Sequence, residues 1–208
     1  MRNPQRFWDR IAKRYDKHGD EKRAVLLETI AYIKRHLEPG DRVLDFACGT
    51  GEKALGVAEG VRSIHGIDLS PAMIERASAK ARERRVENAQ FSRTDLFDPT
   101  LEPASHDAIM AFYILHLVDE PTRALARICE LLKPGGRLIC ETPCLGESSA
   151  FVAWLIALVG KLGLLPEIHC FGLADLEATI TSASSFELVV SQRVGKNRTH
   201  LFVVARKH

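Results

Sequence analysis

The feature that most constrains this chain is a short apolar run that leads into a glycine-rich turn, residues 43–51 (VLDFACGTG). Gly49 and Gly51 let the backbone adopt tight or left-handed geometry and leave room for a ligand to approach. A helix is predicted to begin at about Glu52, and its free N–H groups and positive dipole end would point at the same place. The segment therefore predicts a strand, a turn and a helix arranged around a bound ligand.

Short apolar segments alternate with helical segments through the middle of the chain. Runs rich in Val, Ile, Leu and Phe suit strands that are buried on both faces, and they predict strands at 42–47, 63–68, 89–94, 107–112 and 136–142. Helices are predicted at 52–59, 71–85 and 121–132, and residues 133–136 (KPGG) are predicted to turn the chain into the next strand. This alternation indicates an α/β fold, Rossmann-like and doubly wound, with a mostly parallel sheet.

Both ends of the chain depart from this alternation. Residues 4–37 predict two charged amphipathic helices that are broken near Gly19. A helix is predicted at 173–182, and two strands at 186–194 and 199–206 are joined by a short turn that suits a hairpin. We therefore expect seven strands, with one antiparallel strand at the C-terminal edge. A single domain is predicted over residues 1–208, with a helical cover (1–40), a cofactor-binding core (41–145), an apolar substrate-side insertion (146–172) and a closing helix and hairpin (173–208).

Carboxylates accompany three successive predicted strands. Asp68 ends the second strand, 17 residues beyond Gly51, where an acid can accept two hydrogen bonds from a ribose diol. Asp45 stands just upstream of the glycines. Asp95 follows the third strand, where an acid can accept a hydrogen bond from an adenine amino group. The three acids together predict a cofactor that contains a nucleoside.

Two cofactor classes are compatible with this pattern. Gly49-x-Gly51-x-x-Ala54 satisfies the dinucleotide fingerprint, with Asp68 near the usual offset of about 20 residues, and would indicate an NAD-dependent oxidoreductase. That fingerprint does not require Asp45, whereas a ligand with an ammonium group beside its ribose needs an acceptor there. S-adenosylmethionine has that ammonium and no pyrophosphate, so the three acids favour it. A non-catalytic cofactor-binding protein of the same fold is a further interpretation.

On these residues, the sequence resembles class I S-adenosylmethionine-dependent methyltransferases of the small-molecule and lipid branch. VLDFACGTG is similar to the family's first motif, GIDLSPAMIERA to its second and RTDLFD to its adenine-binding segment. DAIMAFYILHLVDEP and RICELLKPGGRLI are similar to its fourth strand and to the turn before its fifth. FWDRIAKRYD resembles the amino-terminal helix of ubiquinone/menaquinone-biosynthesis and phospholipid N-methyltransferase relatives. The chain departs at Ala47, where the family most often has glycine, and we expect modest crowding there without loss of binding.

The resemblance implies a role for each matching position. Asp45 and the backbone of Ala47, Gly49 and Gly51 would hold the methionine portion of S-adenosylmethionine. The other implied contacts are Asp68 at the ribose, Leu69 and Met73 against the adenine, Asp95 and Leu96 at the adenine amino group and ring, Ala111 and Phe112 beneath the sulfonium, and Tyr15 as a cover from the amino-terminal side.

Methyl transfer depends on alignment and on exclusion of water, and it requires no nucleophilic side chain. A general base helps when the acceptor carries a proton. His116 is the leading candidate, since it lies four residues past Phe112 and its ordinary pKa is about 6.5. Packing against the following helix is the alternative interpretation of His116, and Tyr113, Glu141 and His169 are weaker candidates for the base. No CxxC or HxxxH spacing occurs, so no metal site is predicted.

Residues 151–165 (FVAWLIALVGKLGLL) are apolar except for Lys161 and two glycines, and are shorter than the roughly 18 uncharged residues of a membrane span. The segment follows the fifth strand, where this fold commonly inserts substrate-recognition elements. It predicts a core or cap helix, a wall of a lipophilic substrate pocket that also touches a membrane, or a dimer interface. We expect a monomer or homodimer that acts on a small, lipophilic acceptor such as a quinone precursor or phospholipid headgroup. Basic residues in the first 23 positions would aid a peripheral membrane contact.

Charge and cysteine content bear on partners and compartment. The 29 Lys and Arg residues against 27 Asp and Glu give a net charge of +2, whereas nucleic-acid binders usually carry a larger, segregated excess. Nucleic acid is therefore not expected as a partner. Five cysteines without a CxxC pair, together with an opening segment that lacks the apolar core of a signal peptide, predict a cytoplasmic protein with free thiols.

Overall fold

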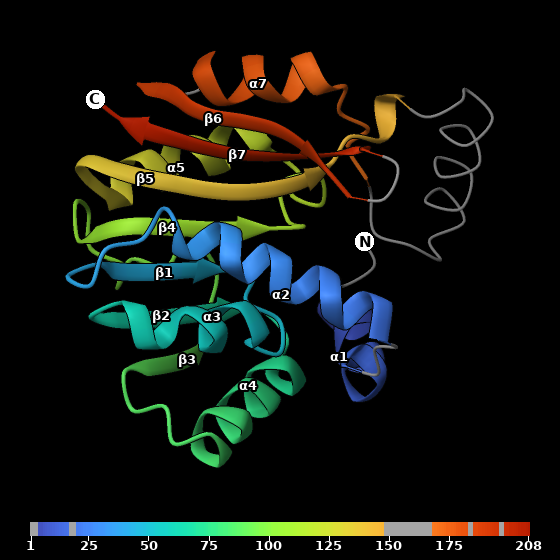
Figure 1. Cartoon of the computed structure of the whole chain (residues 1–208), viewed down its shortest axis with the longest axis vertical. Helices are drawn as coiled ribbons and strands as arrows, with labels where there is room; N and C mark the ends of the chain where they lie inside the picture. Colours follow the sequence, from blue (N-terminus) through green and yellow to red (C-terminus); the bar gives the residue numbers. More distant parts are fainter. Residues whose placement is uncertain (1–3, 17–19, 148–167, 183–184, 196–197) are drawn as a thin grey trace.

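The computed structural model describes residues 4–16, 20–147, 168–182, 185–195 and 198–208 (Figure 1). Its strands are β1 (Arg42–Phe46), β2 (Ser63–Asp68), β3 (Ala89–Arg93), β4 (His106–Phe112), β5 (Leu132–Pro143), β6 (Phe186–Val194) and β7 (His200–Lys207). Its helices are α1 (Pro4–Tyr15), α2 (Asp20–Lys34), α3 (Glu52–Val57), α4 (Pro71–Glu83), α5 (Pro121–Leu131) and α7 (Leu173–Ser182), with short 3₁₀ turns η1 (Ala58–Gly60) and η2 (Leu145–Glu147).

The strands form one seven-stranded sheet in the order β3-β2-β1-β4-β5-β7-β6. Pairing is parallel from β3 through β5, and β7 runs antiparallel to both β5 and β6. The predicted Rossmann-like sheet with one antiparallel strand is confirmed. That strand, β7, lies between β5 and the edge strand β6, because the closing hairpin adds β6 outside it.

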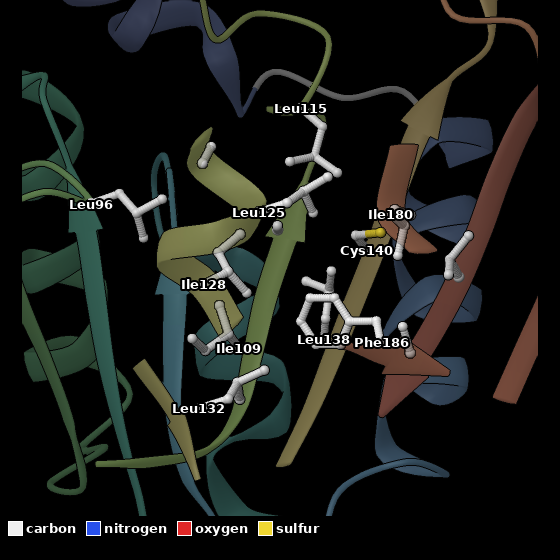
Figure 2. Packing of buried hydrophobic residues seen from close by; sticks show 14 of the residues in the cluster. Leu96, Ile109, Leu115, Leu125, Ile128, Leu132, Leu138, Cys140, Ile180 and Phe186 are labelled. Atoms are coloured by element: carbon white, nitrogen blue, oxygen red, sulfur yellow. The ribbon is translucent and has the colours of Figure 1, made fainter. Parts of the chain in front are cut away.

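Helices cover both faces of the sheet, and each face has its own apolar core. Successive residues of a strand point to opposite faces, so Ile109 of β4 packs toward α5 and α7 while Met110 packs toward α2, α3 and α4. Figure 2 shows the first of these cores, in which Ile128 of α5 and Ile180 of α7 lie close to β4 and β5. This burial on both faces explains why the strands contain near-continuous apolar runs.

The predicted turn at residues 133–136 is built differently from the expectation. Strand β5 already begins at Leu132, which pairs with His106, and the next aligned pair is Ala108 with Arg137. Residues 133–136 therefore bulge out of the pairing between two aligned positions, with Gly135 at a φ of 75°.

The apolar segment 151–165, which is predicted to form a core or cap helix, a pocket wall or a dimer interface, lies outside the described residues.

The carboxyl ends of the parallel strands meet at one edge of the sheet. In Figure 1 the arrowheads of β1, β4 and β5 point toward the same side of the molecule, where α1 lies. The strand order reverses between β1 and β4, because β1 continues to β2 on one side and pairs with β4 on the other. Ligands of open α/β sheets bind outside the carboxyl ends at such a switch point.

Candidate functional site

The glycine-rich turn after β1 has a compact left-handed geometry. Ala47, Gly49 and Gly51 have φ angles of 58°, 55° and 76°. A side chain at Gly51 would also come within 2.9 Å of the Phe91 ring, so both backbone conformation and space require glycine there. Gly51 is the N-cap of α3, which begins at Glu52 as predicted, and the helix N-terminus faces the turn.

Two adjoining cavities open at this edge of the sheet, with volumes of about 400 Å³ and about 690 Å³. They share Tyr15, Ala47, Gly49, Phe112 and Tyr113 as lining residues. The smaller cavity is also lined by Asp68, Leu69, Met73, Asp95 and Leu96, and the larger by Asp45 and Lys53. The structure thus brings together ten of the thirteen predicted site residues: Tyr15, Asp45, Ala47, Gly49, Asp68, Leu69, Met73, Asp95, Leu96 and Phe112.

Three of the predicted residues line neither cavity. Gly51 packs against Phe91 and Ala77 behind the turn, and Ala111 is fully buried in the core that packs against α5. His116 lies in the turn after β4, where burial and the nearby His200 and His169 lower its pKa to about 4. The residue is 8% exposed, and its Nδ1 has no hydrogen-bond partner among the described residues. The roles predicted for these three residues stay predictions.

Asp68 is the last residue of β2 and lines the smaller cavity. Its Oδ2 accepts a hydrogen bond from the Gly49 backbone N–H at 3.0 Å, and its Oδ1 accepts one from the Ser70 N–H at 2.9 Å. Burial raises the pKa of this carboxyl, although the backbone hydrogen bonds act in the opposite direction. Each carboxylate oxygen has a second lone pair, so Asp68 can tie down the glycine turn and also accept hydrogen bonds from a ligand diol.

Asp45 and Lys53 place opposite charges in the larger cavity. Asp45 is 3% exposed, and Lys53 and Asp68 are the charged groups that act on its carboxyl. Burial raises the pKa of Asp45 to about 7, even though Lys53 favours its charged form. The Lys53 ammonium lies 5.2 Å and 5.1 Å from the ring centroids of Phe112 and Tyr113, and burial lowers its pKa. A buried acid in this state binds a cation readily, because the cation compensates for lost solvation.

Helix α1 covers the smaller cavity. Trp8 and Tyr15 line it, and their ring centroids lie 6.4 Å apart in an edge-to-face arrangement. Asp9 accepts a hydrogen bond from the Ser70 hydroxyl at 2.5 Å, and Asp16 accepts one from the Thr50 hydroxyl, also at 2.5 Å. Both aspartates thereby attach α1 to the turns that follow β1 and β2.

Sequence reasoning missed several residues of the site. Lys53, Trp8 and Phe97 line the cavities, yet no local pattern distinguishes them from ordinary helix and loop residues. The placement of α1 over the turns after β1 and β2 depends on hydrogen bonds between residues that lie 34 and 61 positions apart in the sequence. Among the described residues, no group of three or more His, Cys, Asp or Glu side chains could hold a metal ion. None of the helices in the described ranges is long and apolar enough to cross a membrane.

The comparisons with known proteins agree with this geometry. A family model described as a methyltransferase domain matches residues 37–162. The aklanonic acid methyltransferase DauC of Streptomyces sp. (strain C5) is 33% identical over 139 residues, covering 65% of this chain and 63% of the relative. The ubiquinone biosynthesis O-methyltransferase of Xanthomonas axonopodis pv. citri (strain 306) is 32% identical over 150 residues, covering 70% and 61%. The chain thus spans less than two thirds of the length of these relatives.

Solved structures show the same fold at lower identity. The [4+2]-cyclase SpnF aligns with a TM-score of 0.72 and 24% identity, over 88% of this chain and 79% of that one. A geranyl diphosphate methyltransferase in complex with GPP and sinefungin aligns with a TM-score of 0.71 and 16% identity, over 87% and 77%. One of the two is named a cyclase, so the fold alone does not establish the reaction.

Proposed function

The chain belongs to the S-adenosylmethionine-dependent methyltransferases, and from this premise we propose that it transfers the methyl group of that cofactor to a small-molecule acceptor. The observation that supports this best is the set of acids around the paired cavities. Asp45, Asp68 and Asp95 lie at or just beyond the carboxyl ends of three adjacent strands and line the two adjoining cavities at the switch point of the sheet. The NAD-dependent alternative is not favoured, since neither the family model nor the relatives point to it.

The side chains fit the cofactor in its two parts. The smaller cavity combines apolar walls from Leu69, Met73 and Leu96 with the carboxylates of Asp68 and Asp95, which suits an adenosine. In the larger cavity, Asp45 is a buried carboxyl whose pKa is raised by burial, which suits the ammonium of a methionine portion. Ala47 and Gly49 lie where the two cavities meet.

The bound cofactor supplies an activated methyl group on a positively charged sulfur. The protein's part is to align the acceptor with that carbon, to exclude water and to remove a proton where the acceptor has one. Phe112 and Tyr113 line both cavities, so they stand where the two parts of the cofactor would meet, beside the sulfur that an acceptor has to approach. His116, the general base predicted from the sequence, is uncharged at neutral pH because its pKa is about 4, and it lines neither cavity.

For the acceptor, we infer a small, lipophilic, quinone-like molecule. Beyond the residues proposed to contact the adenosine, the wall of the smaller cavity continues past the end of β4 through Ile114, Leu117 and Val118, and this apolar surface suits a lipophilic acceptor. The printed names of the relatives refer to aklanonic acid and to ubiquinone biosynthesis. A cytoplasmic location, a monomer or homodimer, and a peripheral membrane contact remain part of this proposal.

Calorimetric titration with S-adenosylhomocysteine and with NAD tests the cofactor assignment. We expect binding of the first and none of the second. Asp68→Ala should weaken binding by about 1–3 kcal/mol, on the order of a lost buried hydrogen-bonding group. Binding of NAD alone would refute the proposed function, and an unchanged dissociation constant for Asp68→Ala would refute the ribose contact. If S-adenosylhomocysteine binds but no acceptor is methylated, the non-catalytic interpretation gains support.

A further inference from the structure

Beside the shared wall of the two cavities, two polar side chains from different elements converge on one carboxylate oxygen of a buried glutamate. The Tyr113 hydroxyl donates a hydrogen bond to Oε1 of Glu141 at 2.6 Å, and Nδ1 of His200 lies 2.9 Å from the same atom. Glu141 belongs to β5 and is 3% exposed, whereas His200 begins β7 and pairs with Pro143. The sheet register thus places a tyrosine, a carboxylate and an imidazole in a continuous chain.

Tyr113 is held firmly in this position. Its backbone N–H donates to the Glu141 carbonyl at 2.9 Å, so Glu141 binds it through both backbone and side chain. Its φ of 57° is left-handed, which is uncommon for a residue with a bulky side chain, and such conformations gather at functional sites. Its ring also lies edge-on to His200, with centroids 5.5 Å apart. The surrounding contacts therefore maintain a backbone conformation that would otherwise be disfavoured.

Only Tyr113 of the three lines the cavities, and it lines both of them. Burial and the neighbouring Glu141 raise the pKa of its phenol well above the ordinary value, so the phenol keeps its proton and donates it to Glu141. The phenol oxygen retains lone pairs that can accept a hydrogen bond from a bound molecule. The Lys53 ammonium lies 5.1 Å from the Tyr113 ring centroid and adds positive charge beside the ring.

We propose that Tyr113, Glu141 and His200 form a proton relay that removes the proton from a hydroxyl group of the acceptor, so that the substrate class is a hydroxylated small molecule that becomes O-methylated. This inference rests on the proposed methyl transfer. Tyr113 is the catalytic residue of the relay, because it touches the acceptor. Glu141 and His200 are positioning residues that act through it.

The step balances in protons and electrons. The acceptor hydroxyl passes its proton to the Tyr113 oxygen as Tyr113 passes its own to Oε1 of Glu141, which passes it on to Nδ1 of His200 in the tautomer that carries its proton on Nε2. The acceptor oxygen then uses an electron pair to form a bond to the methyl carbon. The carbon–sulfur bond breaks with its electron pair on sulfur, which leaves neutral S-adenosylhomocysteine and a methyl ether. The proton returns to solvent through the partly exposed His200.

A hydroxyl acceptor suits this relay better than an amine does. A neutral hydroxyl oxygen is a weak nucleophile until its proton leaves, whereas a neutral amine attacks with its free electron pair and loses the proton afterwards. The relay offers an oxygen that accepts a hydrogen bond and a route that carries the proton away, both of which a hydroxyl acceptor uses before the attack.

Other titratable groups interact electrostatically with the three relay residues. They are Lys53 of α3, Tyr15 of α1, Cys140 of β5 and His116 after β4, together with His169, which acts on His116.

The test compares catechol with 4-nitrocatechol, whose hydroxyl is more acidic, and with o-phenylenediamine as the matched amine. The variants are Tyr113→Phe, Glu141→Gln and His200→Gln, with Tyr32→Phe on α2 as the control. Tyr32 packs against Phe202 and lines neither cavity. Methyl transfer is followed from pH 6 to 10 by mass spectrometry, and cofactor binding and thermal unfolding of each variant are measured alongside.

For catechol at neutral pH, we expect the Tyr113 and Glu141 variants to lose about 100-fold or more in kcat, with KM changed little. The loss should shrink on 4-nitrocatechol and at high pH, because the acceptor then ionises without help. If the three residues had a merely structural role, each substitution would lower kcat for catechol and for 4-nitrocatechol by the same factor. Equal loss on both, unchanged activity on catechol in Tyr113→Phe, or methylation of the diamine alone would overturn the relay. Those results would leave the proposed function intact, whereas failure to bind S-adenosylhomocysteine would refute that function itself.

Discussion

Ala47 occupies a left-handed position that glycine would adopt without penalty. Its φ is 58°, between a strand end and a turn that lines both cavities. A left-handed conformation costs an L-residue about 1–2 kcal/mol, and the greater freedom of glycine in the unfolded chain offsets part of that. We expect Ala47→Gly to raise the free energy of unfolding by about 1 kcal/mol, as measured by urea denaturation.

A matched substitution separates this effect from the general effect of glycine. Ala79 is an exposed residue inside α4, where φ is helical. Ala79→Gly should lower stability by about 1 kcal/mol, since glycine is the poorer helix former. If both variants lose stability alike, the left-handed strain assigned to Ala47 is wrong.

The buried carboxyl of Asp45 should make cofactor affinity depend on pH. Burial raises its pKa from the ordinary 3.8 to about 7, so part of it is protonated in the free protein at neutral pH. The cofactor's ammonium favours the ionised form, and binding below pH 7 must therefore release a proton. Affinity for S-adenosylhomocysteine should rise with pH up to about 7, by at most about tenfold per pH unit, and level off above.

Asp45→Asn supplies the comparison, because its amide does not titrate. Its affinity should be lower than that of the wild type at pH 8, and its pH dependence between 5.5 and 8 should be flatter. Calorimetry in two buffers of different ionisation enthalpy would also count the released protons. An equal pH dependence in both proteins would show that Asp45 does not carry the effect.

The sequence allowed the strand-end acids to be predicted, because each is encoded locally. Asp68 ends an apolar strand at a readable distance from the glycines, and the structure puts its carboxylate against the turn. Glu141 and His200 meet only because β5 and β7 pair in a particular antiparallel register. That register results from packing between distant segments, so the sequence suggested Glu141 as a candidate without giving its partners.

At the scale of elements, the aspartate that directly follows α1 makes more polar contacts with the core than Asp9 within the helix does. Asp16 accepts a hydrogen bond from Thr50 and forms ion pairs with Arg76 at 3.1 Å and Lys80 at 2.8 Å. Lys80 is mostly buried and also pairs with Glu52, so the group is better shielded than a surface pair. We expect Asp16→Ala to release α1 and to weaken cofactor binding about tenfold, mainly through faster dissociation in stopped-flow measurements.

Glu130→Ala is the control for Asp16→Ala. Glu130 pairs with Arg127 on α5, at 2.8 Å and with a side chain that is 52% exposed. Such surface pairs contribute about 0–1 kcal/mol, and this one lies against the other face of the sheet. Cofactor dissociation should therefore be unchanged in Glu130→Ala. Unaltered dissociation in Asp16→Ala would mean that α1 does not retain the cofactor.

Most elements could be predicted from local patterns, and the exceptions have a physical cause. The bounds of β2 and β6 match the sequence expectation, because apolar content and turn residues define both ends. Residues 133–136 contain the signals of a turn, yet Leu132 still pairs with His106 on β4 and extends β5 backward. Pairing with a neighbouring strand extended β5 beyond its local turn signal.

At the scale of the whole molecule, the two halves of the sheet have different tasks. Strands β1, β2, β3 and β4 end around the cavities, whereas β6 reaches neither of them. The cofactor should therefore stabilise one side of the molecule more than the other. A ligand at about 100 times its dissociation constant adds about 2.7 kcal/mol to global stability, while local opening is suppressed only where the ligand or its cover makes contact.

Hydrogen exchange with and without S-adenosylhomocysteine tests this division. We expect stronger protection in α1, in the turn at residues 47–51 and in the segment from Asp68 to Met73, because these line or cover the cavities. The amides of β6, an edge strand that pairs only with β7, should exchange at nearly the same rate in both states as long as exchange proceeds by local opening. Protection centred on β6 and β7, with α1 unchanged, would place the cofactor elsewhere on the sheet and contradict the site.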